Sequence, residues 1–175
     1  YCNYLKELIG YFCERWDKIF IFKYRPGFGW VERVLVPYIK SKNIANIRIE
    51  NKPLVSYLHR VDRIILDWPS TGFFESVAAG MPTLSLYWRS HPLGDEARDF
   101  FGPMLQPFRD AKEAIGHIDS FLASDKKEYV TELPLVQSDI ADLFHRMEIS
   151  GRNRENILCK SGSKEDTRLA WRDRE

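Results

Sequence analysis

Two hydroxyls, a glycine and a carboxylate stand close together near the middle of the chain: Ser70, Thr71, Gly72 and Glu75. The apolar residues from Phe73 to Ala79 recur at helical spacing, so Ser70 is predicted at the N-cap and Glu75 in the first turns of a helix. The first amides of a helix lack intrahelical acceptors and carry the positive end of the dipole, which suits a phosphate. Gly72 has no Cβ to keep a phosphate away from the backbone. An ordinary capped helix explains the same residues, so both interpretations stay open on local grounds.

The elements that would position these residues are short and follow one another closely. Arg63 to Leu66 is an apolar run of strand length, and Thr83 to Tyr87 is a second. Gly80 is placed to end the helix between them, and Pro82 prevents that helix from continuing. Two parallel strands joined by a right-handed crossover helix are the economical arrangement of such a unit.

The string DWPSTGFFESVAAGMPTLSL, residues 67–86, resembles the donor-site segment in the C-terminal domain of GT-B glycosyltransferases. In that superfamily an S-x-G or S-T-G turn is followed by E-x-x-A-x-G-x-P and a strand. The layout is similar to the transferase that adds N-acetylglucosamine to lipid I, and to Kdo and glycerophosphate transferases of surface polymers. It looks closest to transferases of bacterial surface-carbohydrate loci, whose R-x-Y-P and G-W are echoed by residues 23–26 and 28–30. The specific match covers about residues 16 to 95.

The resemblance implies a site for a nucleotide-activated sugar at the helix turn. It assigns the diphosphate to Ser70, Thr71 and Gly72, the ribose hydroxyls to Glu75, and the vicinity of the base to Ile49, Glu50 and Asn51. A carboxylate one turn into the helix suits a diol beside the phosphate, which agrees with this assignment. Asp67 to Pro69, directly before the turn, are bulkier than the small residues of some relatives.

Three cations are candidates for neutralising the diphosphate. Lys23 and Arg25 end the strand predicted over residues 18–24, and ligands collect at the carboxyl ends of strands in open α/β sheets. The guanidinium fork of Arg25 suits bidentate phosphate contact. Arg89, just after the strand that follows the helix, is the third candidate. Solvated charge at a strand end is the alternative interpretation.

A polar loop follows the second strand of the unit, over residues 88–98. In relatives this loop reaches toward the sugar, which implicates His91 or Asp95 in contacting a hexose. An exposed loop with a helix N-cap at Asp95 is the alternative.

The remaining elements alternate along the chain. Helices are predicted over residues 4–16, 31–39, 53–58 and 110–124, with a further helix in residues 129–147 that begins after Pro134, and strands over residues 18–24 and 44–49. In the first helix the core-facing stripe comprises Tyr4, Leu5, Leu8, Ile9, Phe12 and Trp16. The predicted fold is α/β, a three-layer Rossmann-like domain with a mostly parallel sheet over residues 1–150. Residues 151–175 are predicted to form a polar tail, partly disordered or a short terminal helix.

Composition excludes several classes of protein. The 175 residues are 44% hydrophobic and 29% charged with a net charge of +1, which gives no general attraction to nucleic acid or membranes. No apolar run is long enough to span a bilayer and no signal peptide is visible, and three cysteines without metal-ligand spacing fit a reducing, cytoplasmic context. No metal and no cofactor are predicted. Tyr1 in place of Met suggests a piece of a longer protein.

The residues and the resemblance together predict the donor-binding domain of a metal-independent GT-B glycosyltransferase. It would take a sugar from a UDP-, GDP-, CDP- or CMP-linked donor for a surface-polysaccharide or glycolipid acceptor. The general base would come from a missing N-terminal acceptor domain, so turnover by this domain alone is not expected. The expected setting is cytoplasmic, with peripheral contact to the cytoplasmic membrane left open. A nucleotide-sugar 2-epimerase and a non-catalytic Rossmann-like interaction module are the alternatives.

Overall fold

The described part of the chain comprises residues 2–24, 27 and 29–130 of a computed structural model. Up to Pro92 and from Arg98 onward these residues belong to one compact unit, and residues 93–97 belong to a second. The boundary predicted at residue 150, the tail 151–175 and the helix predicted after Pro134 lie outside the described residues.

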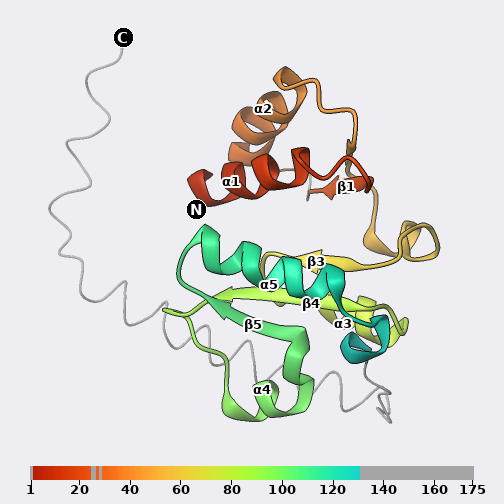
Figure 1. The fold of residues 1–175 in the computed structure, drawn as a ribbon, viewed down its shortest axis with the longest axis vertical. Helices are drawn as coiled ribbons and strands as arrows, with labels where there is room; N and C mark the ends of the chain where they lie inside the picture. The colour runs from red at the N-terminus through yellow and green to blue at the C-terminus, as the bar shows by residue number, and fades with distance from the viewer. Residues whose placement is uncertain (1, 25–26, 28, 131–175) are drawn as a thin grey trace, which may run out of the picture. The chain divides into compact units, whose positions relative to one another are not determined.

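Helices and strands alternate along the chain, as the colours of Figure 1 show. The α-helices are α1 (Cys2–Cys13), α2 (Val36–Ser41), α3 (Thr71–Ala78), α4 (Asp95–Phe101) and α5 (Ala111–Ala123). The strands are β1 (Phe20–Lys23), β2 (Ile47–Glu50), β3 (Ile64–Leu66), β4 (Thr83–Trp88) and β5 (Leu105–Phe108). Shorter helical turns are η1 (Val31–Leu35), η2 (Leu54–Ser56), η3 (Leu58–Arg60), η4 (Gly102–Met104) and η5 (Lys126–Tyr129).

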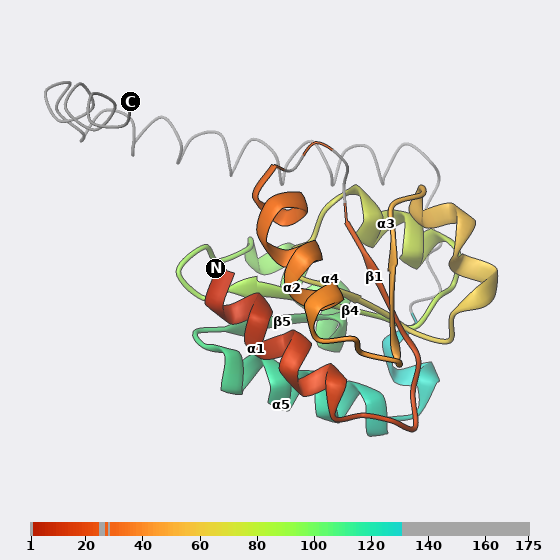
Figure 2. The ribbon, with the colours of Figure 1, turned by 90° about the horizontal axis from the view of Figure 1, so that it is seen from above.

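Every strand pair in the described residues is parallel. β1 pairs with β2, and β3, β4 and β5 form a second sheet in that order. Figures 1 and 2 show α3 on one face of the second sheet and α5 on the other, which makes three layers. The predicted α/β class with mostly parallel strands is therefore confirmed, although the strands divide between two sheets.

β4 is the central strand of the three-stranded sheet and is buried from Thr83 to Tyr87. A strand with neighbours on both edges and helices on both faces has no side toward water, so its sequence is a nearly continuous run without alternating charges. On one face α3 buries Phe73, Phe74 and Val77, each worth about 2–3 kcal/mol of burial. These contacts explain why the strand, helix and strand predicted between residues 63 and 87 form as a unit.

The end of α3 has the predicted glycine stop. Gly80 adopts a φ of +67°, a backbone conformation that favours glycine. Its amide donates to the carbonyl of Val77 at 2.9 Å, and the Met81 amide donates to Ser76 at 3.0 Å. These two bonds form a Schellman motif, which satisfies the last carbonyls of the helix before Pro82 begins the link to β4.

Two predicted elements differ from the structure. α1 ends at Cys13, so Trp16 lies beyond the helical stripe and is 72% exposed instead of facing the core. Residues 53–58 form the turns η2 and η3 in place of one α-helix. The Tyr57 amide donates to the Leu54 carbonyl at 2.9 Å, which is the hydrogen bond between residues three apart that defines a 3-10 turn. The Tyr57 side chain at the end of this turn is buried in the core.

Arg63 links the C-terminus of α5 to the start of β3 through hydrogen bonds. Its guanidinium donates to the carbonyl of Phe121 at 2.6 Å and to that of Ser124 at 2.7 Å. Cations near a helix C-terminus satisfy the last carbonyls and suit the negative end of the dipole. The residue that opens the predicted strand thus also holds the last turn of the covering helix.

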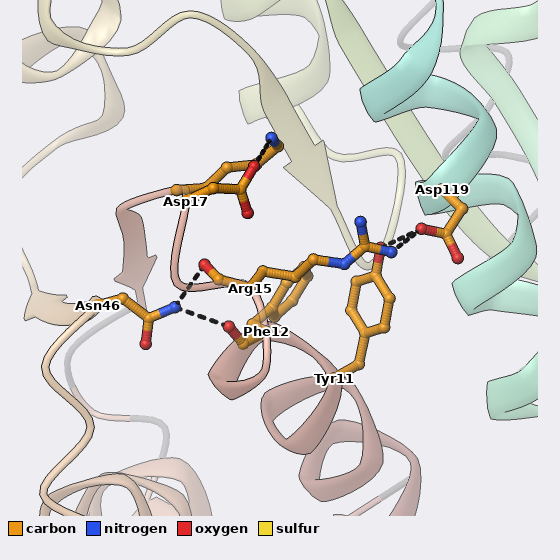
Figure 3. A network of polar contacts seen from close by, with 7 residues as sticks. Tyr11, Phe12, Arg15, Asp17, Asn46 and Asp119 are labelled. Atoms are coloured by element: carbon orange, nitrogen blue, oxygen red, sulfur yellow. Dashed lines mark hydrogen bonds and ion pairs between the residues drawn. The ribbon is translucent and has the colours of Figure 1, made fainter.

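The end of α1 is held from two sides (Figure 3). Tyr11 donates to Asp119 of α5 at 2.6 Å, and Arg15 forms an ion pair with the same carboxylate. From the other side, Nδ2 of the buried Asn46 donates to the carbonyls of Phe12 at 2.8 Å and Arg15 at 2.9 Å. Asn46 therefore caps α1 from the residue before β2. β2 begins at Ile47 and not at the predicted residue 44, because the residues before it form a turn in which the Ile47 amide donates to Ile44 at 3.4 Å.

We expect Asn46→Ala to destabilise the fold by about 1–3 kcal/mol, because the two buried side-chain hydrogen bonds to the carbonyls of Phe12 and Arg15 are lost, although each carbonyl keeps a backbone donor. Asn46→Asp should be at least as damaging, since a carboxylate cannot donate to either carbonyl. Urea unfolding followed by circular dichroism measures both. The exposed Asn51→Ala is the matched control and should change stability by less than about 0.5 kcal/mol. Equal stability of all three variants would contradict the capping role.

Alkaline pH should weaken the fold through its buried and hydrogen-bonded phenols. Burial raises the pKa of Tyr4, with a contribution from Asp67, and burial with the hydrogen bond to Asp119 raises the pKa of Tyr11. A raised folded-state pKa gives stability that is complete below the unfolded pKa of about 10 and is lost as pH rises above it. The urea midpoint should therefore fall above about pH 10. Tyr11→Phe should fall less steeply, and an unchanged slope would exclude this phenol as a cause.

Candidate functional site

Three loops leave the same edge of the three-stranded sheet, because β3, β4 and β5 are parallel. The loop after β3 runs through residues 67–70, the loop after β4 begins at Arg89, and the loop after β5 comprises Arg109 and Asp110. Ligands of open α/β sheets gather at this carboxyl edge. The structure thus brings the predicted turn at Ser70 and the predicted cation Arg89 to one edge.

The N-terminus of α3 has no side-chain cap. Ser70 is at the N-cap position with an extended backbone (φ −126°, ψ −171°), but its hydroxyl makes no capping bond. The Phe73 amide donates to the Ser70 carbonyl at 2.9 Å. Thr71 and Gly72 are the first two residues of α3, so their amides have no acceptor within the helix. These amides point along the helix axis, toward an acceptor outside the helix. The side chains of Ser70 and Thr71 are exposed at this point.

The N-terminus of α5, at the same edge, is closed by its own side chains. The Asp110 carboxylate accepts from the Glu113 amide at 2.9 Å, and the Glu113 carboxylate accepts from the Arg109 amide at 2.9 Å. The arrangement resembles a capping box, except that Glu113 accepts from the residue before the N-cap Asp110. Of these two helix starts, only that of α3 lacks a side-chain cap, whereas at α5 the Asp110 carboxylate already places a negative charge on the amides.

Gly72 has a packing role that the sequence did not reveal. A Cβ at this position would lie 3.2 Å from Cδ2 of Leu54 and 3.9 Å from Cδ2 of Leu66. The space expected for a phosphate beside the missing Cβ is therefore lined by leucine side chains. Packing of η2 against the first turn of α3 is sufficient to explain the glycine, and the phosphate interpretation depends on the direction of the amides instead.

Glu75 lies one turn into α3 and is exposed. Its carboxylate has no ion pair or side-chain hydrogen bond within the described part of the chain. A carboxylate in the first turns of a helix is favoured by the dipole and remains ready to accept hydrogen bonds. The predicted ribose ligand is thus accessible and uncommitted.

Arg89 is at the predicted edge but already has a partner. Its amide continues the sheet by donating to Phe108 at 2.8 Å, and its guanidinium forms an ion pair with Glu113 of α5. Glu113 uses its other carboxylate oxygen for the Arg109 amide. A ligand that takes up Arg89 must therefore compete with this ion pair or share the guanidinium with it.

The predicted residues of the two-stranded sheet lie at its carboxyl edge. Lys23 ends β1 with an exposed side chain and stands opposite Glu50 in the register. Arg25 lies outside the described residues. The Glu50 carboxylate accepts from the Tyr57 hydroxyl at 3.1 Å, and that bond raises the pKa of Tyr57 together with burial, the larger cause.

The segment after β2 links the predicted base vicinity to the turn. Ile49 is half-buried, Asn51 is exposed, and η2 begins three residues later. Leu54 of η2 then packs on Gly72. The predicted base residues and the predicted phosphate turn are therefore joined through one short segment.

An aromatic pair connects the loops after β3 and β4. The rings of Trp68 and His91 meet edge-on, with centroids 6.4 Å apart and an interplanar angle of 84°. Asp95, the other predicted hexose contact, is the first residue of α4 and begins a helix as the alternative interpretation had it. It belongs to the second unit.

Sequence reasoning missed two residues that shape this edge, Glu113 and Leu54. The spacing of Asp110 and Glu113 is a capping-box signal, so the start of α5 was predictable. The ion pair of Glu113 with Arg89 joins residues 24 positions apart, which no local pattern indicates. Nothing in the sequence signals that Leu54 fills the space at Gly72.

The described residues contain no group of three or more side chains suited to a metal ion. No helix among them combines the length and apolar character needed to cross a membrane. Comparison of the chain with protein-family models, curated proteins and solved structures found no match. The GT-B resemblance therefore stays a prediction from the sequence.

We expect Gly72→Val to destabilise the fold by about 1–3 kcal/mol, because the new side chain meets Leu54. In a double-mutant cycle with Leu54→Ala, measured by urea unfolding, the two costs should not add. Gly116→Val in α5 is the control, since a Cβ there meets nothing within 4 Å. Additive costs would show that position 72 is limited by something other than Leu54.

Proposed function

We propose that this chain is the donor-binding domain of a metal-independent glycosyltransferase that uses nucleotide-activated sugars. Ser70, Thr71 and Gly72 would hold the phosphates, and Glu75 would bind the ribose hydroxyls. The observation that carries the proposal is the uncapped start of α3 at the carboxyl edge of a parallel sheet, while α5 at the same edge is self-capped.

The chemistry asked of this domain is stabilisation of the leaving group. An acceptor hydroxyl attacks the anomeric carbon, the bond from that carbon to the phosphate oxygen breaks, and the proton passes to a general base. Helix amides aimed at the departing phosphate stabilise its developing charge without reorganising. The exposed hydroxyls of Ser70 and Thr71 add donors, and Arg89 supplies a cation when it turns from Glu113. The general base and the acceptor site would belong to a further domain, and the enzyme would work in the cytoplasm.

The decisive test removes one backbone amide. Thr71 occupies the first position of α3, where proline is well tolerated, and the extended backbone of Ser70 is compatible with a following proline. Thr71→Pro should therefore fold normally yet bind nucleotides about tenfold or more weakly, the worth of a charge-assisted hydrogen bond. Calorimetric titration with UDP, GDP, CDP and CMP measures the loss.

Thr71→Ala is the control, because it removes the hydroxyl and keeps the amide. Selective binding of one nucleotide by the unmodified chain, lost in Thr71→Pro and largely kept in Thr71→Ala, would support the proposal. Equal weak responses to all four nucleotides, unchanged in both variants, would favour the interaction module. Turnover of a nucleotide sugar without acceptor would favour the epimerase.

Glu75 can be tested with a matched pair of ligands. Glu75→Ala should weaken binding of the ribonucleotide by about tenfold, because a carboxylate acceptor for the ribose is lost. The 2′-deoxy form of the same nucleotide should bind the unmodified chain more weakly and respond less to the substitution. An equal loss for both forms would remove Glu75 from the ribose contact.

A further inference from the structure

Trp68 stands two residues before the open turn and keeps 40% of its surface exposed. Its ring is held edge-on by His91 at a centroid distance of 6.4 Å. His91 is itself fixed, since its amide donates to Trp88 at 2.8 Å and its Nδ1 lies 3.0 Å from the Ser90 hydroxyl. Pro69, directly after the tryptophan, is buried and restricts the backbone. The indole is therefore contacted from both loops and keeps part of its surface open to water.

The other aromatic residues at this edge are used in packing. Trp88 and Phe108, at the ends of β4 and β5, have centroids 4.4 Å apart, and Tyr4 of α1 covers both. Phe108 is fully buried. Trp68 meets His91 edge-on, and the 40% of its surface that stays exposed is not used in packing. A rigid, partly exposed aromatic ring beside a polar site is suited to stacking with a ring of a ligand.

The neighbours of the turn at Ser70 indicate which ring of the ligand would stack on Trp68. On one side, the segment from the predicted base vicinity packs on Gly72 through Leu54. Trp68 contacts the loop after β4, which comes from a different strand of the sheet. A nucleotide sugar with its base toward η2 and its phosphates on the α3 amides would therefore carry its sugar toward Trp68. The C–H face of a pyranose is apolar and its rim is polar, which matches an indole with an imidazole at its edge.

We propose that Trp68, held in place by His91, stacks against the sugar ring of the donor and that the donor sugar is a pyranose. This inference rests on the proposed function, because it takes the phosphate position at α3 as given. Trp68 would then be the residue that distinguishes a sugar-bearing nucleotide from the bare nucleotide and from an acyclic polyol donor.

The experiment compares each nucleotide with its sugar by calorimetry: UDP with UDP-glucose and UDP-N-acetylglucosamine, GDP with GDP-mannose, and CDP with CDP-glycerol as the acyclic case. In the unmodified chain we expect the matching nucleotide sugar to bind more tightly than its nucleotide. Trp68→Ala should remove this advantage, weakening the nucleotide sugar by about three- to tenfold while the nucleotide changes less than about twofold. Trp68→Phe should keep part of the advantage.

Trp16→Ala is the matched control, because Trp16 is even more exposed and lies between α1 and β1. It should leave all affinities unchanged, and thermal unfolding of each variant verifies folding. Intact nucleotide binding with a sugar advantage that survives Trp68→Ala, or with no sugar advantage at all, would overturn this inference alone. An equal loss for nucleotide and nucleotide sugar would place the base on Trp68 and overturn it too. Failure of the unmodified chain to bind any of these ligands would overturn the proposed function and this inference together.

Discussion

The burial of β4 on both of its faces is the constraint on which the rest of the described structure depends. A central strand without a water-facing side needs a helix on each face, and α3 and α5 provide them. Since β3, β4 and β5 are parallel, both helices must start at the carboxyl edge. Two positive helix ends therefore meet the loops after the strands at the same edge, and the fold leaves open only how each end is satisfied.

The N-termini of α3 and α5 differ in how they are satisfied. Asp110 and Glu113 close α5, whereas Ser70 leaves α3 open and the next carboxylate, Glu75, stays exposed. Loops and helix ends at such an edge tolerate change because the packed strands below them carry most of the stability. A domain that serves only as a scaffold has no need of an uncapped helix start, whereas a ligand-binding domain does. The contrast between α3 and α5 therefore supports ligand binding, but it does not identify the ligand.

Local signals in the sequence were sufficient for the central unit. The apolar period of α3, the glycine stop at Gly80 and the strand runs on either side each depend on neighbouring residues, and the structure confirms them. Features set by distant partners were not predictable in this way. Asn46 caps a helix more than thirty residues away, a contact that no local pattern announces. The exposure of Trp16 follows from where α1 ends, which apolar spacing alone does not determine.

Glu113 has a further consequence for the charge at the edge. Its two oxygens have separate partners, the guanidinium of Arg89 and the amide of Arg109. If the Arg89 guanidinium swings away, the carboxylate keeps the Arg109 amide and the Arg109 side chain, whose Nε lies 3.6 Å from the same oxygen, and it stays at the positive end of the α5 dipole. Glu113 therefore remains compensated without Arg89, which lowers the electrostatic cost for that arginine to turn toward another anion.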